Sequence, residues 1–349
     1  MHVTARITFV AMLGTAIGAM SEAQAGIFDN PGNYLIADQF NNRVIEVDSA
    51  GQIVWSFGRG PHDFTAKSIV GVNDAERVGR DTLMAGTGIP AGADPFCKNP
   101  AGCMDNRVML VDPNGKIVWQ YGTFGVAGAG PNQLNAPVQS TYTPEKTVFI
   151  TDQGNQRVIE VTKAGNIRWQ YGQTGTSGSG ADQLNDPNSA ELLDNGDILI
   201  ADEGNNRAIE VDRHKHIVAQ YTAGGTLNGV AFASRLVNGD TLITDAGNNR
   251  IVEVDAHDNI VWQYATNLET GSNAAPQPTR AVQTQNGAIL ISDQFNNRVI
   301  LVNKKTKEIL RQFGHLNHIG YGTTSTREGL DAPYDAKVIG DFTGLTPPY

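Results

Sequence analysis

The sequence predicts an all-β fold, a six-bladed β-propeller whose blades are four-stranded antiparallel sheets. A phrase of the form D-x-x-N-N-R-V-I-E-V-D occurs six times with variations, and neighbouring copies of its arginine are 43 to 64 residues apart: Arg43, Arg107, Arg157, Arg207, Arg250 and Arg298. A repeat of about this length made of short strands is typical of propellers and solenoids. Each phrase is surrounded by further short apolar segments, and the two ends of the chain supply complementary parts of one unit.

One repeat unit contains four predicted strands. In the fourth copy, the apolar segment 197–201 is followed by a turn at residues 203–206, whose Gly and Asn tolerate positive φ. Residues 207–211 alternate between polar and apolar, as in a half-buried strand, and residues 216–221 form the next strand. Residues 187–193 supply a strand before the unit. Four antiparallel strands per unit make one propeller blade.

The outermost strand of four units carries a tryptophan in the same register. These residues are Trp55, Trp119, Trp169 and Trp262. An aromatic side chain repeated at one strand position is expected to pack between adjacent sheets.

The chain ends predict how the ring closes. The first unit, residues 33–57, has no strand before it, whereas residues 330–339 follow the last unit and resemble 134–137 and 184–187, which begin inner strands. We therefore expect residues 332–339 to pair beside residues 34–38. Such closure removes free sheet edges.

The segment before the repeats has the features of a secretory signal peptide. Arg6 precedes an apolar stretch at residues 7–20, and residues 23–25 read A-Q-A, an A-x-A cleavage signature. An N-terminal membrane anchor is the alternative, but 14 apolar residues are fewer than the roughly 20 that span a bilayer. The sequence thus predicts a signal peptide at residues 1–25, one domain at 26–349, a periplasmic or secreted location, and no integral membrane segment after cleavage.

Composition limits the partners. The formal net charge is −10, and an acidic protein repels phosphate backbones, so no nucleic-acid partner is expected. The two cysteines, Cys97 and Cys103, are six residues apart. In an exported protein this spacing favours a disulfide that closes a small loop. A metal pair is the alternative, although no further Cys or His lies near enough in sequence to complete a tetrahedral set.

The repeated phrase, followed by G-x-I-V-W-Q-Y-G and then L-N-x-P, resembles the NHL repeat over essentially all of residues 26–349. The resemblance implies a six-bladed propeller. Proteins with such propellers include protein-binding and RNA-binding platforms and also enzymes, so the fold does not decide the function. Among the relatives, peptidyl-hydroxyglycine lyases use a histidine-held zinc and a calcium in the channel. The chain is also remotely similar to bacterial arylsulfotransferases and propeller lactonases, and His62-Asp63 is similar to the H-D phrase of the sulfotransferases.

Most repeated polar residues are expected to serve the architecture. An Asp and an Arg flank the same tight turn in nearly every copy, so they should hydrogen-bond across it or to its backbone. Four glutamates alternate with apolar neighbours and are expected at solvated strand positions: Glu46, Glu160, Glu210 and Glu253.

The copies differ mainly on one face of the predicted ring. Turns within blades on one side are short throughout, such as residues 194–196, and we call this side the short-turn face. The other side, the long-loop face, carries the crossings between blades and the turns between second and third strands. It includes residues 58–67, 122–135, 172–185, 314–330 and the insertion 86–105 with both cysteines. Long loops on a rigid scaffold commonly carry binding residues.

Histidines on the long-loop face are the first candidate site. His62 and Asp63 follow the first blade, and His315, His318 and Tyr321 follow the sixth, which is its neighbour in a closed ring. These residues could form a metal or acid/base cluster. They could equally be ordinary loop residues.

The channel mouth is the second candidate site. The starts of the innermost strands should bring these residues near the axis: Asn73, Asp74, Gln139, Asn188, Ser189, Asn228, Arg280, Tyr334 and Asp335. Amides with one or two carboxylates would suit calcium or another divalent metal. Arg280 facing Asp335 or Asp74 would suit an anionic small molecule instead. A hydrogen-bonded, water-filled lining is the remaining alternative.

Three functions remain open on the sequence alone, the third being a purely structural role inside a cell-envelope assembly. The first is an exported binding module that engages a protein, a glycan or a small-molecule ligand through the long-loop face and channel mouth. The second is a metal-dependent lyase-like or hydrolase-like enzyme. Its catalytic candidates are His62, Asp63, His315, His318, Tyr321 and Arg280, and its metal candidates are His62, His315, His318 and Asp335.

Overall fold

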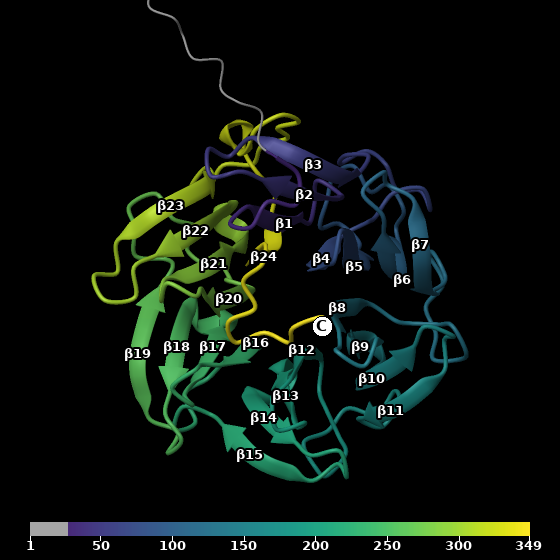
Figure 1. Cartoon of the computed structure of the whole chain (residues 1–349), viewed down its shortest axis with the longest axis vertical. Coiled ribbons are helices and arrows are strands. Elements are labelled where there is room, and N and C mark those ends of the chain that lie inside the picture. Colours follow the sequence, from purple (N-terminus) through teal and green to yellow (C-terminus); the bar gives the residue numbers. More distant parts are fainter. Residues whose placement is uncertain (1–26) are drawn as a thin grey trace, which may run out of the picture.

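A computed structural model describes residues 27–349, and these residues form six four-stranded sheets arranged as a ring (Figure 1). Blade 1 consists of β24 (Pro333–Val338), β1 (Tyr34–Asp38), β2 (Arg43–Val47) and β3 (Ile53–Gly58). The predicted fold class is therefore confirmed. The predicted signal peptide, residues 1–25, lies outside the described residues.

In the other blades the strands follow chain order from the channel outward. Blade 2 contains β4 (Val72–Val78), β5 (Asp81–Ile89), β6 (Cys103–Val111) and β7 (Ile117–Gly122). Blade 3 contains β8 (Pro137–Tyr142), β9 (Thr147–Asp152), β10 (Arg157–Thr162) and β11 (Ile167–Tyr171). Blade 4 contains β12 (Pro187–Leu192), β13 (Ile198–Asp202), β14 (Arg207–Val211) and β15 (Ile217–Tyr221).

The last two blades repeat the plan. Blade 5 contains β16 (Val230–Arg235), β17 (Thr241–Asp245), β18 (Arg250–Val254) and β19 (Ile260–Ala265). Blade 6 contains β20 (Arg280–Gln283), β21 (Ile289–Asp293), β22 (Arg298–Val302) and β23 (Ile309–Gly314). Short 3-10 turns complete the structure: η1 (Gln153–Asn155), η2 (Glu203–Asn205), η3 (Ala246–Asn248), η4 (Gln294–Asn296) and η5 (Thr326–Glu328).

The ring closes as the chain ends predict. β24 pairs antiparallel with β1, with Ile36 opposite Ala336 and Tyr34 opposite Val338. Two backbone hydrogen bonds extend the pairing, from Gly32 N to Ile339 O and from Ile339 N to Asn33 O. Blade 1 is thus assembled from both ends of the repeat region.

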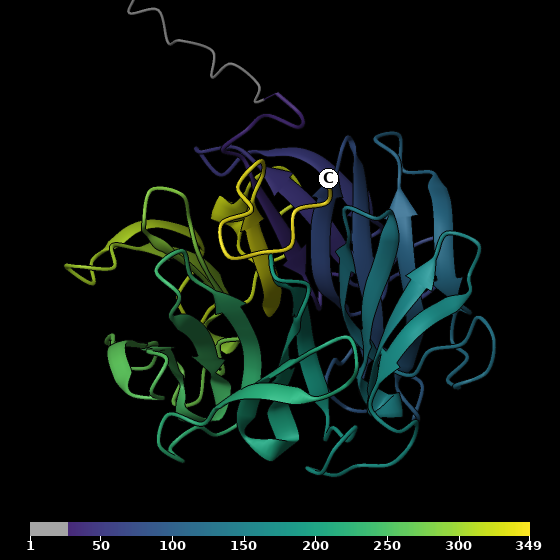
Figure 2. The ribbon, with the colours of Figure 1, turned by 60° about the horizontal axis from the view of Figure 1, so that its bottom comes forward.

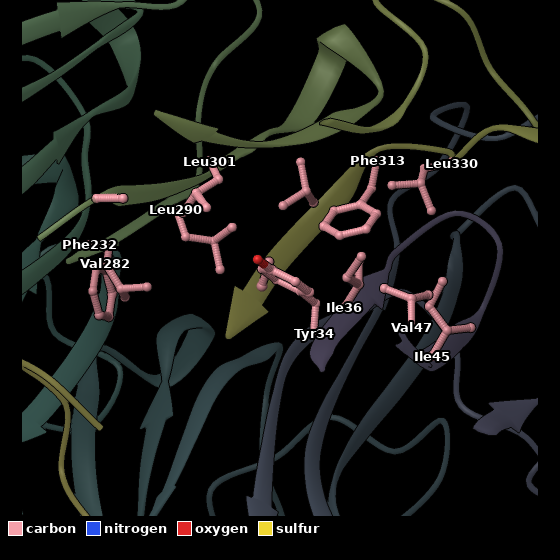
Figure 3. Close-up of a cluster of buried hydrophobic side chains, with 13 residues drawn as sticks. Tyr34, Ile36, Ile45, Val47, Phe232, Val282, Leu290, Leu301, Phe313 and Leu330 are labelled. Atoms are coloured by element: carbon pink, nitrogen blue, oxygen red, sulfur yellow. The ribbon is translucent and has the colours of Figure 1, made fainter. Parts of the chain in front are cut away.

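Apolar side chains fill the space between neighbouring blades. At the closure, Tyr34 and Ile36 of blade 1 lie with Leu290 and Phe313 of blade 6 in one buried cluster (Figure 3). The tryptophans pack between sheets as expected, and each also donates an Nε1–H bond to a turn of the next blade. The acceptors are carbonyl oxygens 2.7–3.1 Å away: Trp55 to Pro113, Trp119 to Lys163, Trp169 to Arg213 and Trp262 to Lys304.

The repeated Asp and Arg hold the turn between second and third strands. In blade 3, Asp152 Oδ2 accepts bonds from Asn155 Nδ2 at 2.7 Å and from Arg157 Nε at 2.8 Å, while Gln156 adopts a φ of 60°. Blade 2 has Gly86 at the usual Asp position. A Cβ at Gly86 would lie 2.6 Å from Cγ of Asp105, whose carboxylate binds Arg107 Nε at 2.5 Å. The carboxylate is therefore kept, but the neighbouring strand supplies it.

The four repeated glutamates are buried, which corrects the expectation that they are solvated. Their residues are between 0% and 9% exposed. Each pairs with a basic side chain of the following blade at 2.5–2.6 Å: Glu46 with Arg77, Glu160 with Arg213, Glu210 with Arg235 and Glu253 with Lys304. The reason is that both surfaces of a third strand are covered in a propeller, so strand alternation does not identify a solvated side.

Candidate functional site

The middle of the channel is occupied by a buried ion-pair network. Arg280 of β20 lies 3.1 Å from Asp74 of β4 and 2.7 Å from Asp335 of β24. Lys337 Nζ lies 2.7 Å from Asp74 and 2.5 Å from Asp335. Burial raises the pKa of Asp335, but the charges of Arg280 and Lys337 outweigh it and lower that pKa overall. The network joins blades 1, 2 and 6 through side chains.

The predicted channel-mouth residues mostly bind one another. Asn188 of blade 4 donates to the hydroxyl of Tyr334 of blade 1 at 3.0 Å, so the bond crosses the ring. Asn73 accepts a bond from Gln39 at 2.8 Å. Gln139 donates to Glu191 at 2.7 Å. The first-strand positions therefore form a belt of direct bonds between blades.

The remaining two channel-mouth candidates differ from each other. Ser189 Oγ is buried and accepts a bond of 3.4 Å from Ala233 N of the next blade. Asn228 is exposed, and its amide lies against Gly247, where a Cβ would come within 2.6 Å of Nδ2. The structure thus brings seven of the nine candidates into the channel as partners, leaves Ser189 at its edge and places Asn228 on the surface.

The C-terminal tail, residues 339–349, crosses the channel at the short-turn face (Figures 1 and 2). Thr346 donates from its backbone N and from Oγ1 to Glu191 Oε2, at 2.8 Å and 2.7 Å. Leu192 N in turn donates to Thr346 Oγ1 at 2.8 Å. A cleft of about 570 Å³ remains between the tail and blades 4 and 5.

The candidate histidines lie in two groups. His315 and His318 have ring centroids 6.3 Å apart, and His315 Nε2 donates to the carbonyl of Arg327 at 2.6 Å. His62 instead contacts Phe96, with ring centroids 4.1 Å apart. Asp63 lies 3.5 Å from Arg59. Within residues 27–349, no group of three or more His, Cys, Asp or Glu side chains is placed to hold a metal ion.

The insertion in blade 2 is closed by the predicted disulfide between Cys97 and Cys103. Cys97 is buried with Val70 and Ile89, and the side chains of Phe40 and Phe64 pack against them. This anchors the loop that carries Asp94 and Phe96. Phe96 lies between His62 and Tyr321, 6.2 Å from the Tyr321 ring centroid. Loops of blades 1, 2 and 6 therefore meet at one place on the long-loop face.

Tyr321 is presented by a clamped segment. Asn41 Nδ2 donates to the carbonyl of Gly320 at 2.9 Å, and Arg43 donates to the carbonyl of Gly322. Both flanking glycines approach Glu328 closely; a Cβ at Gly320 would lie 2.1 Å from the Glu328 carbonyl oxygen. Half of the Tyr321 side chain stays exposed between these fixed points.

Asp331 belongs to this junction, and sequence reasoning missed it. Its backbone N donates to Asp38 Oδ1 at 2.8 Å, and its carbonyl accepts from Phe40 N at 3.1 Å. The same two backbone bonds are made in blades 3, 4 and 5 by asparagines: Asn135, Asn185 and Asn228. The signal is visible in the sequence, because residues 330–333 read L-D-A-P, whereas the equivalent residues 134–137 read L-N-A-P.

Within residues 27–349, Asp331 and Asp94 carry carboxylates without cationic partners. Asp331 is 7% exposed, and burial with the nearby charges of Asp38 and Asp94 raises its pKa to about 7. Asp94 is 4% exposed; its Oδ1 accepts from Phe96 N at 2.7 Å, and its Oδ2 has no hydrogen-bond partner among residues 27–349. We call His62, Asp94, Phe96, Tyr321 and Asp331 the junction site.

The raised pKa of Asp331 makes folding stability depend on pH. Its ordinary pKa is 3.8 and its pKa in the fold is about 7, so between these values the folded chain holds a proton that the unfolded chain has released. Stability should therefore fall as pH rises through this window. Asp331→Asn should remove this contribution, and its advantage over wild type should grow by on the order of 4 kcal/mol from about pH 4 to about pH 8. Urea unfolding of both proteins at both pH values measures this difference. An equal change in unfolding free energy with pH for the two proteins would contradict the raised pKa of Asp331.

Comparisons with known proteins agree with the fold. A family model described as outer membrane protein assembly factor BamB matches residues 104–312. A protein of unknown function from Bacteroides caccae superposes with a TM-score of 0.58 at 12% identity, covering 88% of this chain and 98% of its own. The structure titled nidogen/laminin complex contains a chain with a TM-score of 0.54 at 12% identity, covering 81% and 93%. Virginiamycin B lyase from Staphylococcus aureus has a TM-score of 0.50 at 13% identity, covering 81% and 84%.

At these identities the structural likenesses establish the propeller fold. No curated protein matches the sequence. None of the helices in residues 27–349 has the length and apolar character needed to cross a membrane.

Proposed function

The chain belongs to the family described as outer membrane protein assembly factor BamB, and from this premise we propose that it is an exported binding module that engages a protein partner through its long-loop face. The observation that carries the proposal is the junction site, where loops of three blades are fixed together, Tyr321 stays half exposed, and the acids have no cationic partner among residues 27–349. The blades below it form a rigid support, because their side chains bond directly across the channel.

The location of these groups favours a protein over a small ligand. Most channel-mouth candidates are engaged by other side chains of the ring, so the groups available to a partner lie on the outer loops. A surface built from several loops suits a partner that is itself a surface. The disulfide fits a periplasmic or secreted protein. We also propose that the blades follow the NHL-type pattern within the broader family.

We do not propose the metal-dependent enzyme. The histidines that motivated it lie apart, with His62 against Phe96 and with His315 and His318 against each other. No observation of the fold or the site favours that function over binding.

Site-specific photo-crosslinking tests the proposal. A photoreactive phenylalanine analogue would replace Tyr321 in one protein and Val237, 89% exposed near the short-turn face, in a matched one. Irradiation in the cells that make the protein should give a defined protein adduct from position 321 and none from position 237. Adducts only from position 237, or none from either, would contradict the proposal.

A further inference from the structure

We propose that the junction site binds a basic side chain, an arginine or a lysine, that the protein partner presents. The cation would lie between the carboxylates of Asp94 and Asp331 and against the rings of Phe96 and Tyr321. The inference rests on the proposed function and names the chemistry of its contact point.

The carboxylate of Asp331 is not required by the fold. In blades 3 and 4 the equivalent residues, Asn135 and Asn185, place an amide against a glycine, where a Cβ would come within 2.5–2.6 Å of it. In blade 1, Asp331 makes the same backbone bonds, but its side chain is an acid, and Phe40 takes the position of the glycine. A buried carboxylate without a cation is unfavourable, and the amide used elsewhere in the ring would avoid it. A cation from outside residues 27–349 would therefore stabilise the charged form of Asp331.

Asp94 supplies the second unpaired acid. It is almost fully buried on a loop that the Cys97–Cys103 disulfide holds, yet one of its oxygens has no donor among residues 27–349. Its charge contributes to the raised pKa of both Asp331 and Tyr321, so its carboxylate lies within electrostatic range of both. Phe96, two residues further along the same loop, lies 6.2 Å from the ring centroid of Tyr321, so the loops of blades 2 and 6 bring the two acids to the same junction.

The nearby cations are already engaged. Arg43 pairs with Asp38 at 2.7 Å and also donates to the carbonyl of Gly322. Arg59 lies 3.5 Å from Asp63. Among residues 27–349, the charged groups that act on Asp331 are Asp38, which Arg43 neutralises, and Asp94, which has no cationic partner.

The walls of the site favour an organic cation over a metal ion. Phe96 is flanked by His62 and Tyr321, and aromatic faces attract guanidinium and ammonium groups while offering no hard oxygen ligands. Calcium takes six to eight oxygen ligands as a rule, whereas two carboxylates and a planar wall suit a guanidinium.

The protein itself uses this combination elsewhere in the ring. Arg107 binds Asp105 and lies over the ring of Phe124, with its guanidinium carbon 4.8 Å from the centroid. Arg77 binds Glu46 and lies 4.6 Å from the centroid of Phe28. In both cases an acid and an aromatic ring fix one arginine. The junction site has the acids and the rings but no arginine of its own.

Calorimetry with a small probe tests the inference. N-acetyl-arginine methylamide should bind the full protein weakly and saturably, and the neutral citrulline analogue should not. Asp331→Asn and Asp94→Asn should each weaken the arginine probe about tenfold or more, since each removes a charge-assisted contact. Asp331→Asn installs the residue that three other blades carry, so it should fold, and Asp94→Asn gives an independent second variant.

Glu145→Gln is the matched control. Glu145 is exposed in a turn of blade 3 on the short-turn face, and its replacement changes the net charge by the same amount. It should leave probe binding unchanged. The inference is overturned if wild type does not bind the probe, if the citrulline analogue binds equally, or if all three variants behave like wild type. A titration with calcium chloride checks the metal alternative. If calcium binds wild type, fails to bind either Asp variant and competes with the arginine probe, the inference is overturned in favour of a metal site.

The two proposals fail in different ways. A partner adduct from position 321 that forms equally in Asp331→Asn and Asp94→Asn proteins would overturn the basic-side-chain inference and leave the protein-binding function standing. Loss of the adduct in these variants but not in Glu145→Gln supports both.

Discussion

Replacing Arg280 with methionine is expected to lower the free energy of unfolding by about 3–5 kcal/mol, because it leaves buried carboxylates without their main partner. Arg280 is 2% exposed and lies between Asp74 and Asp335, with Phe232 beneath its guanidinium at 4.2 Å. After the replacement, Lys337 alone would face both acids. Urea unfolding followed by circular dichroism measures the loss.

The control is an arginine of the same protein whose own side chain is largely exposed and whose partner keeps a second, closer arginine, Arg213. Arg168 is 51% exposed and lies 3.7 Å from Glu160, so Arg168→Met should change stability by less than about 1 kcal/mol. Adding Asp74→Asn to Arg280→Met should recover part of the lost stability, because it removes one of the two buried carboxylates that no longer have the arginine as a partner. Equal effects of Arg280→Met and Arg168→Met would show that the channel network does not stabilise the ring.

The fold could be predicted because its information is repeated along the chain. Six copies of one phrase fix the blade plan, and a missing strand at one end with a spare strand at the other fixes the closure. A copy whose pattern is ambiguous can be assigned by comparison with the other copies. The pairing of β24 with β1 was therefore predictable from residues 330–339 alone.

The channel network was harder to predict because its partners come from different blades. Asp74 and Lys337 are 263 residues apart in the chain, yet their side chains meet at 2.7 Å. A list of strand starts places Asp74 near the axis, but it does not include Lys337 and does not say which side chains will pair. The predicted calcium or anion contacts at Asp335 and Arg280 are instead filled by the protein's own side chains.

Asp331 illustrates a different kind of miss. Its repeat position was recognised as the start of an inner strand, but the change from Asn to Asp was not compared between copies. Because the phrase is repeated, each residue can be compared with the residue at the same position in the other copies. A changed residue can therefore be detected from this one sequence. The four glutamates illustrate the opposite case. Glu46 and its three equivalents share one repeat position, and the structure buries all four in ion pairs instead of leaving them solvated.

Removing residues 333–349 is expected to abolish cooperative folding. The deletion takes away β24, so β1 becomes an open edge at the channel and the core between blades 1 and 6 loses Ala336. It also removes Asp335 and Lys337, which leaves Arg280 with Asp74 alone. An exposed inner strand is a template for association with other chains. Size-exclusion chromatography should show aggregates, and thermal unfolding should show no sharp transition.

Removing only residues 340–349 is the matched control, because it keeps β24 and takes away the tail across the channel. Glu191 then loses both bonds from Thr346, and its carboxylate keeps the bond from Gln139. The expected loss is about 1–3 kcal/mol, the effect of unpairing a buried acceptor, with the transition still cooperative. If the longer deletion gave a monomer with the same sharp transition as the shorter one, closure by β24 would not be what holds the ring. The two deletions thus separate the strand that completes blade 1 from the segment that merely covers the channel.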